Sequence, residues 1–193
     1  MTSGTAHGRG VTALPRRLAG SALAGAASGA RSLTGVAALT LATRPGAPGQ
    51  PDRFLGRPWV KATAGVLAAQ EYVLDKLPST PSRLAPAGLA GRLAGAAASA
   101  VIIARREPGA PATSAETASC AAAGLGAAVA TAWLGVRWRT WAKARFGQDW
   151  IGAGLEDVAT LTVAVTVAFT AAGARDLRSS MTKDELIKPR RKH

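Results

Sequence analysis

The stretch ASCAAAGLGAAVATAWLGV, residues 118–136, decides the fold class. No charged side chain occurs from Thr117 to Val136. A helix that crosses the hydrocarbon core of a bilayer needs roughly 20 predominantly apolar residues. A helix on the surface of a soluble protein instead needs a charged face, which this stretch does not offer. The stretch is therefore predicted to be a transmembrane helix.

Four further apolar tracts of similar length lie on either side of it, at residues 18–42, 59–77, 84–104 and 150–172. The segments between them are rich in proline and glycine, which is typical of turns. We therefore predict an all-α fold, an integral membrane bundle of about five transmembrane helices. The predicted organisation is a flexible N-terminal tail (1–17), a transmembrane domain (18–173) and a basic, polar C-terminal tail (174–193).

The composition leaves one alternative open, a soluble alanine-rich bundle. Hydrophobic residues make up 48% of the chain but aromatic residues only 5%, and the mean hydropathy is +0.12. The polar tails and gaps lower that average, so we favour the membrane interpretation. Small residues allow helices to approach closely in lipid, and Gly25-x-x-x-Gly29 and Gly91-x-x-x-Gly95 are candidate contact motifs.

The chain is strongly basic, with 24 Lys and Arg against 11 Asp and Glu, a formal net charge of +13. These residues lie mainly between the apolar tracts and in the terminal KPRRKH, and they form no long basic stripe on one helix. This placement favours anionic lipid headgroups as partners and argues against nucleic acid. The expected location is the bacterial inner membrane.

The topology expected from five crossings places the two termini on opposite sides of the membrane. The weight of basic residues after Arg175 suggests that the C-terminal tail is cytoplasmic. The segment PRRLAGSALAGAASGA, residues 15–30, resembles a cleavable signal peptide, but its apolar tract continues past Arg31. We interpret it as a retained first helix.

The chain lacks the residues of the common catalytic and metal sites. Cys120 is the only cysteine, and His7 and His193 are in opposite tails. A Cys/His metal site, a Ser-His-Asp triad and a Cys-His dyad are therefore not expected. We predict no catalytic residue, no metal, no cofactor and no enzyme activity, with a carboxylate-only enzyme acting on lipid as the least favoured alternative.

Several charged residues fall inside the apolar tracts. An arginine at the centre of a transmembrane helix costs about 2.5–3.5 kcal/mol, which roughly cancels the contribution of the leucines and valines around Arg31. Such charges are expected to pair or to line a wet cavity, although Arg31 could also reach an interface by snorkelling. We predict one intramembrane cluster, formed by Arg31, Glu71, Asp75, Arg92, Glu156 and Asp157.

Two features concern the connections between tracts. The segment DKLPSTPSR, residues 75–83, is predicted to be a rigid corner at the membrane surface, with interfacial residues Lys76, Pro78, Pro81, Ser82 and Arg83. An arginine-bearing tract is followed by an acidic residue twice, which suggests an inverted repeat of the kind found in transporters.

The segments EYVLDKLPSTPSRLAPAGLAGRLAGA, GVRWRTWAKARFGQDWIGAGLEDVAT and GAASGARSLTG resemble a bacterial family of small multi-pass membrane proteins catalogued as domain of unknown function 4126. The resemblance covers most of the chain, from the first tract to the fifth. It implies membrane residence and an all-helical fold, and it supplies no activity.

Two functions follow as expectations. The first is transport or permeation of a small solute or ion through a helical bundle lined by charges. The second is a scaffold or assembly factor that transports nothing, in which the same charges hold the helices together. A homo-oligomer is compatible with either function.

Overall fold

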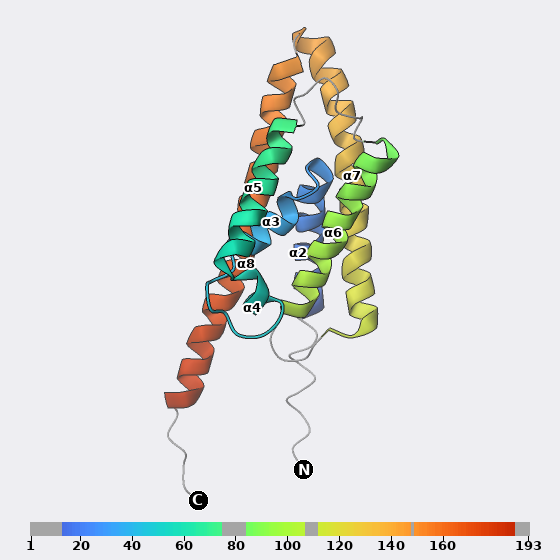
Figure 1. Ribbon diagram of the computed structural model, residues 1–193. Helices are drawn as coiled ribbons and strands as arrows, with labels where there is room; N and C mark the ends of the chain where they lie inside the picture. The colour runs from blue at the N-terminus through green and yellow to red at the C-terminus, as the bar shows by residue number, and fades with distance from the viewer. Residues whose placement is uncertain (1–12, 75–83, 107–111, 148, 188–193) are drawn as a thin grey trace, which may run out of the picture.

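The computed structural model describes residues 13–74, 84–106, 112–147 and 149–187, and within these ranges the chain is helical with no strand (Figure 1). An all-helical fold is therefore confirmed. The described helices are α2 (Ala13–Ala30), α3 (Thr34–Leu41), α4 (Asp52–Leu55), α5 (Pro58–Leu74), α6 (Pro86–Arg106), α7 (Ser114–Phe146) and α8 (Asp149–Ile187).

Three of the described helices contain segments long and apolar enough to cross a membrane: Pro86–Arg106, Ser114–Phe146 and Trp150–Ala171. They correspond to the third, fourth and fifth predicted tracts. The predicted count of about five spans is not confirmed. The second tract forms α5, which carries Lys61 and Glu71 within 17 residues, and the first tract is divided between α2 and α3.

The central helix of the bundle is α2, which runs parallel to α7 in a constant register (Figure 1). Arg17 pairs with Glu116, while Gly25 lies on Gly124 and Gly29 on Ala128. Each contact joins residues 99 positions apart. A Cβ atom at Gly25 would lie 2.6 Å from the Cα atom of Gly124, so the two backbones touch because neither residue has a larger side chain.

On its other side α2 runs antiparallel to α6. A Cβ atom at Gly20 would lie 3.6 Å from Ile103 Cγ2, and the Arg92 side chain of α6 reaches the carbonyl oxygen of Gly29. Gly91 and Gly95 lie against Ser32, which follows α2. Both predicted small-residue motifs are thus confirmed as contact sites: Gly25, Gly29 and Gly95 meet a backbone, and Gly91 meets the Ser32 side chain.

The first apolar tract turns back on itself between α2 and α3. Gly35 lies against the carbonyl oxygen of Ala24, eleven residues earlier in the chain. A continuous helix would separate these residues by about 16 Å. The prediction that residues 18–42 form one continuous span is therefore wrong, and they form a helical hairpin instead.

This hairpin changes the topology. The chain rises in α2 towards the upper end of Figure 1, descends in α3, rises in α5, descends in α6, rises in α7 and descends in α8. The start of α2 and the end of α8 consequently lie at the same, lower end, which contradicts the expectation of termini on opposite sides. The inverted-repeat prediction is also wrong, because α2 and α7 run in the same direction.

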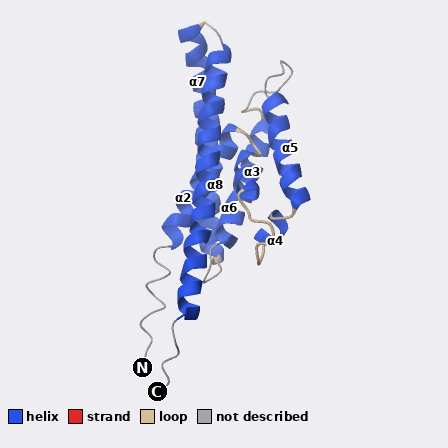
Figure 2. Cartoon of the chain, turned by 90° about the vertical axis from the view of Figure 1, so that its left-hand side faces the viewer, coloured by secondary structure: helices blue, strands red, loops and turns tan. Residues whose placement is uncertain are grey.

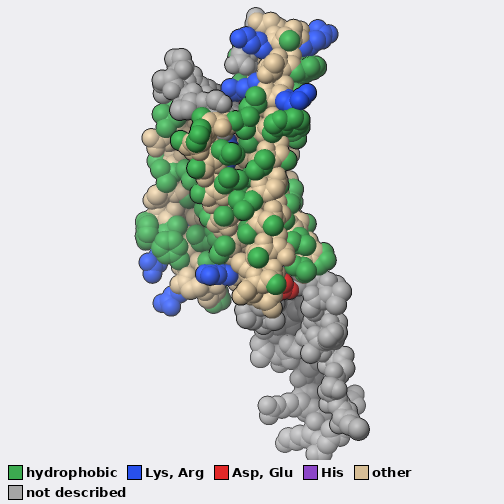
Figure 3. All heavy atoms as spheres, turned by 90° about the vertical axis from the view of Figure 1, so that its right-hand side faces the viewer, with side chains coloured by type: hydrophobic (Ala, Val, Ile, Leu, Met, Phe, Trp, Pro, Cys, Tyr) green, Lys and Arg blue, Asp and Glu red, His purple; other side chains and the backbone are tan. Residues whose placement is uncertain are grey.

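The interior is made of small and polar residues, and many of the large apolar residues face outwards. The fully buried side chains include Ser21, Ser28 and Ser99, whereas Val158 is 62% exposed and Phe169 is 73% exposed. Figure 3 shows apolar side chains covering one face, with basic side chains towards its two ends. This distribution is the reverse of a soluble core and fits a protein whose surroundings are lipid.

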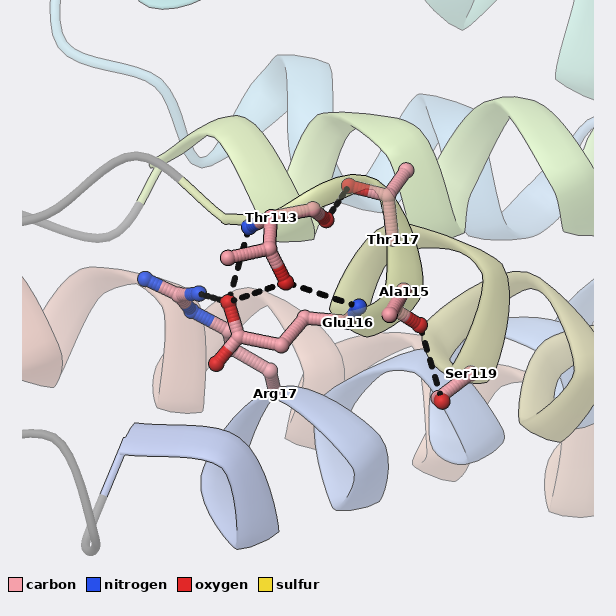
Figure 4. Close-up of polar contacts among 6 residues, drawn as sticks. All are labelled: Arg17, Thr113, Ala115, Glu116, Thr117 and Ser119. Atoms are coloured by element: carbon pink, nitrogen blue, oxygen red, sulfur yellow. Dashed lines mark hydrogen bonds and ion pairs between the residues drawn. The ribbon is translucent and has the colours of Figure 1, made fainter.

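The helix α7 begins and ends with well-defined caps. The Thr113 hydroxyl accepts a hydrogen bond from the Glu116 backbone N–H, while the Glu116 carboxylate accepts one from the Thr113 backbone N–H (Figure 4). The cap is therefore Thr113, which directly precedes the first helical residue, Ser114. The helix continues to Phe146 and ends at Gly147, which has φ +68°.

The last helix extends beyond the predicted transmembrane domain. Its backbone is helical from Asp149 to Ile187, so the predicted boundary at residue 174 falls inside α8. Near its start, Trp138 of α7 donates a hydrogen bond from Nε1 to the carbonyl oxygen of Gly152 at 3.0 Å.

Candidate functional site: a charge-capped hairpin tip

The turn between α2 and α3, residues Arg31, Ser32 and Leu33, is hereafter called the hairpin tip. The backbone N–H of Arg31 still bonds to the Ala27 carbonyl, which ends α2, and the N–H of Ala37 bonds to the Leu33 carbonyl, which begins α3. The N–H groups of Ser32 and Leu33 lie between these two helical ladders. In an apolar interior such groups need a partner, because an unpaired buried N–H is costly.

Glu71 of α5 provides that partner. Its Oε1 accepts a hydrogen bond from Ser32 N–H at 2.5 Å, and its Oε2 accepts one from Leu33 N–H at 3.0 Å. A carboxylate is favoured at this position because the N-terminus of α3 carries a partial positive charge. Glu71 therefore serves as an N-terminal cap contributed by another helix.

Arg92 of α6 caps the opposing end of the turn. Its Nε donates to the carbonyl oxygen of Gly29 at 3.0 Å, and its Nη1 donates to the carbonyl oxygen of Gly88 at 2.9 Å. The last carbonyls of α2 carry a partial negative charge, so a guanidinium is the matching group. Arg92 is 4% exposed, and the contact is therefore shielded from solvent.

Arg31 is the most buried charged residue at the tip, at 2% exposure. Its Nη2 pairs with Oδ1 of Asp157 on α8. Its Cζ atom lies 3.9 Å from the centre of the Tyr72 ring on α5, within the range of a cation–π interaction. The Arg31 side chain thus connects the tip to α8 and α5 together.

Buried hydroxyl groups surround the tip. The side-chain oxygens of Ser28, Ser99, Thr34 and Tyr72 are buried and have no hydrogen-bond partner among the described residues. Ser28 and Ser99, from α2 and α6, both face Gly35 of α3. Polar groups without partners are uncommon in a packed interior and often mark a site where a ligand or water is accommodated.

Four members of the predicted charge cluster gather around the tip: Arg31, Glu71, Arg92 and Asp157. Glu156 forms an ion pair with Arg139 of α7 at 3.2 Å, further along the α7–α8 contact. Asp75 lies outside the described residues, as does the whole predicted corner, Lys76, Pro78, Pro81, Ser82 and Arg83. The prediction of direct pairing between arginines and carboxylates holds for Arg31 with Asp157, whereas Glu71 and Arg92 bind backbone groups.

A second polar cluster lies at the lower end of the bundle. Arg106 of α6 donates from Nε to Asp52 at 2.6 Å and from Nη2 to the Leu39 carbonyl at 2.9 Å. Lys61 donates to the carbonyl oxygen of Thr43 at 2.7 Å. Sequence reasoning missed this cluster, and it caps the C-terminal end of α3 as Glu71 caps its start.

Sequence reasoning also missed Tyr72 and Thr34. Tyr72 is the only tyrosine in the chain and directly follows Glu71, which is the one signal that could have identified it. Thr34 gave no signal, because its importance depends on its being the first residue of α3.

Other kinds of site are not evident in the described part of the chain. No group of three or more His, Cys, Asp and Glu residues there could hold a metal ion. An open pocket of about 730 Å³ lies at the lower end, between Gln50, Arg105 and the first turns of α7, away from the tip. The tip is therefore the strongest candidate for a functional site.

Comparisons with known proteins give no match for this chain, whether with family models, curated proteins or solved structures. The resemblance to domain of unknown function 4126 stays a prediction. The function of the chain is therefore inferred from the geometry of the hairpin.

Proposed function

We propose that this chain is a multi-pass protein of the bacterial inner membrane. The outward-facing apolar residues of α7 and α8, such as Trp133 and Phe169, would contact lipid tails, and the basic residues at the two ends would meet anionic headgroups. In this setting the hairpin of α2 and α3 is re-entrant, because it enters and leaves from one side. Non-helical backbone at membrane depth is tolerated only where protein buries it or where it lines a wet cavity.

The function that this geometry supports best is permeation of a small solute or ion beside the hairpin tip. The observation that carries it is the break in the first tract, where opposed helix ends meet a carboxylate, two guanidiniums and several buried hydroxyls. Secondary transporters bind substrates and ions at the ends of broken helices of this kind. The state described here is a closed one, with the helix ends capped by the protein's own side chains.

A membrane scaffold is the second candidate, and the same capping favours it. Glu71, Arg92 and Asp157 each bind the hairpin from a different helix. Groups so engaged can serve to hold α5, α6 and α8 on the hairpin and conduct nothing. The basic C-terminal segment would then be the part that contacts a partner.

Cysteine accessibility distinguishes the two functions. In a Cys120→Ala background, Ser28→Cys and Ser99→Cys place thiols beside the tip, and Val165→Cys on the lipid-facing side of α8 is the control. If solute passes the tip, a small water-soluble thiol reagent should label the first two in membranes and leave Val165→Cys unlabelled. Complete protection of both tip positions would contradict permeation and favour the scaffold.

A further inference from the structure

The hairpin tip has the donor geometry of a receptor for a small carboxylate. Its two adjacent backbone N–H groups, from Ser32 and Leu33, bind the two oxygens of a single carboxylate. Such paired donors at the start of a helix form a natural anion site. In the closed state the carboxylate that occupies it belongs to the protein itself, Glu71.

A second observation indicates that the site is larger than a simple helix cap. Thr34, the first residue of α3, is 5% exposed, and its hydroxyl has no hydrogen-bond partner among the described residues. The Tyr72 hydroxyl of α5 lies close to it. When α5 withdraws, the Thr34 hydroxyl can therefore donate to a ligand that enters beside Arg31.

The tip and its present occupant are held by different parts of the fold. The tip is fixed by α2, α6 and α8, which form the body of the bundle. The residue that occupies it belongs to α5, which packs mainly on α3 and buries only Val60. Figure 2 shows α5 at the edge of the bundle, beyond α3. Removing the Glu71 side chain would therefore leave the receptor in place.

The size and charge of the site limit the ligand. Gly91 and Gly95 lie against Ser32, where larger side chains would collide with it, so the space at the tip is small. Arg31 is already balanced by Asp157, which leaves the single charge of Arg92 and the partial positive charge of the α3 N-terminus to match one negative charge. A short monocarboxylate fits these limits better than a doubly charged phosphate.

We propose that the hairpin tip binds a short monocarboxylate and that Glu71 is a tethered occupant which the free ligand replaces when α5 withdraws. As a substrate site this inference rests on the proposed permeation function, while as a binding site it is independent of that function. It implies that a free carboxylate and α5 compete for the same two N–H groups.

Chemical rescue by acetate tests the proposal in detergent-purified, full-length protein. Glu71→Ala should lower the melting temperature by about 3–10 °C, since it removes a charge-assisted pair of hydrogen bonds. Sodium acetate should restore much of that loss in a saturable manner, and sodium chloride of equal ionic strength should not. Wild-type protein should respond little, because its site is filled.

Two further variants complete the design. Glu116→Ala removes an exposed carboxylate that also caps a helix and pairs with an arginine, and acetate should not restore its stability. Glu71→Asp keeps the charge with a shorter reach, so it should fold and show a smaller rise with acetate. If acetate acts no differently from chloride on both Glu71 variants, the carboxylate site is excluded.

The rescue and the labelling experiment fail independently. Rescue without thiol labelling at Ser28 and Ser99 would retain the carboxylate site and contradict permeation. Labelling without rescue would retain permeation and exclude the carboxylate as the ligand.

Discussion

Arg31 is a buried charge that is stabilised by side chains from other helices. The residue lies at the end of α2, is 2% exposed, and is met by Asp157 from one side and by the face of Tyr72 from the other. A buried ion pair gains little over an apolar pair of similar volume, but removing one partner leaves an uncompensated charge. Replacing one member of the Arg31–Asp157 pair should therefore destabilise the protein more than replacing both members by apolar residues.

This asymmetry gives the first prediction. Arg31→Met should lower the free energy of unfolding by about 3–5 kcal/mol, because it leaves Asp157 partly buried without this partner. Combining it with Asp157→Leu should recover a large part of that loss. The measurement is a double-mutant cycle by thermal or denaturant unfolding in detergent.

Glu156→Gln is the matched control for that cycle. Its partner Arg139 is 28% exposed, against 2% for Arg31, so water screens this pair more and the change should cost less than breaking the Arg31–Asp157 pair. A double variant as unstable as the sum of the two single changes would mean that Arg31 and Asp157 are not coupled.

At the residue scale, much of the candidate site could be predicted. Arg31, Glu71, Arg92 and Asp157 stand out in the sequence as charges inside apolar tracts, and the structure gathers all four. Their individual partners could not be predicted, because Glu71 and Arg92 bind backbone groups that exist only where the first tract breaks. Hydropathy indicates that a charge inside an apolar tract is costly. It does not indicate whether the fold brings a helix end close enough to bind that charge.

At the scale of elements, glycine positions decide how the helices meet. Gly25 and Gly29 of α2 lie directly on the backbone of α7, whereas Gly126, also in α7, has no neighbour within 4 Å of the place where a Cβ would be. The same substitution should therefore have opposite effects at these positions.

The second prediction compares Gly25→Ala with Gly126→Ala. The first should destabilise the protein by about 1–3 kcal/mol, because its methyl group overlaps Gly124 and forces two backbones apart. The second should be neutral or stabilising by up to about 1 kcal/mol, since alanine is the better helix former. Unfolding midpoints measured in one detergent give both values, and equal effects would contradict the α2–α7 contact.

The hairpin is the element that sequence reasoning could not derive. Length and hydropathy predicted one helix over residues 18–42, and the only local warning was Arg31 near its middle. The residues that stabilise the break, Glu71 and Arg92, are roughly 40 and 60 positions away from it. Tertiary contacts with other helices therefore determine whether the tract crosses the membrane or turns back. The sequence of the tract alone does not reveal those contacts.

At the scale of the whole molecule, the hairpin in the first tract places most of the described basic residues at one end of the bundle. The lower end of Figure 1 holds the start of α2, the segment from the end of α3 to the first turn of α5, the end of α6 and the last turns of α8. These parts carry eleven basic residues: Arg16, Arg17, Arg44, Arg53, Arg57, Lys61, Arg105, Arg106, Arg175, Arg178 and Lys183. The upper end holds the last turns of α7, which carry four: Arg137, Arg139, Lys143 and Arg145. The five-crossing topology divides the basic residues between the two sides of the membrane without a clear bias, because it places residues 43–57 on the side opposite to the N-terminus.

The third prediction follows from this sorting. Segments next to membrane helices that are richer in Lys and Arg remain in the cytoplasm, so the lower end should face the cytoplasm and the α7–α8 turn should face outwards. In a Cys120→Ala background, Gly147→Cys in that turn should react with an impermeant thiol reagent in spheroplasts. Gly49→Cys, in the segment between α3 and α4, should react only after the membrane is opened.

A third cysteine, placed before Arg16, distinguishes the hairpin from a continuous first span, because Gly49 and Gly147 lie on opposite sides of the membrane in both topologies. If residues 18–42 crossed the membrane once, position 49 would lie opposite the start of α2, and a cysteine placed before Arg16 would differ from it in accessibility. With the hairpin, both must be protected together while Gly147→Cys is labelled. Labelling of Gly49→Cys in spheroplasts while the cysteine before Arg16 stays protected would therefore contradict the turn at Arg31, and with it the receptor that the turn creates.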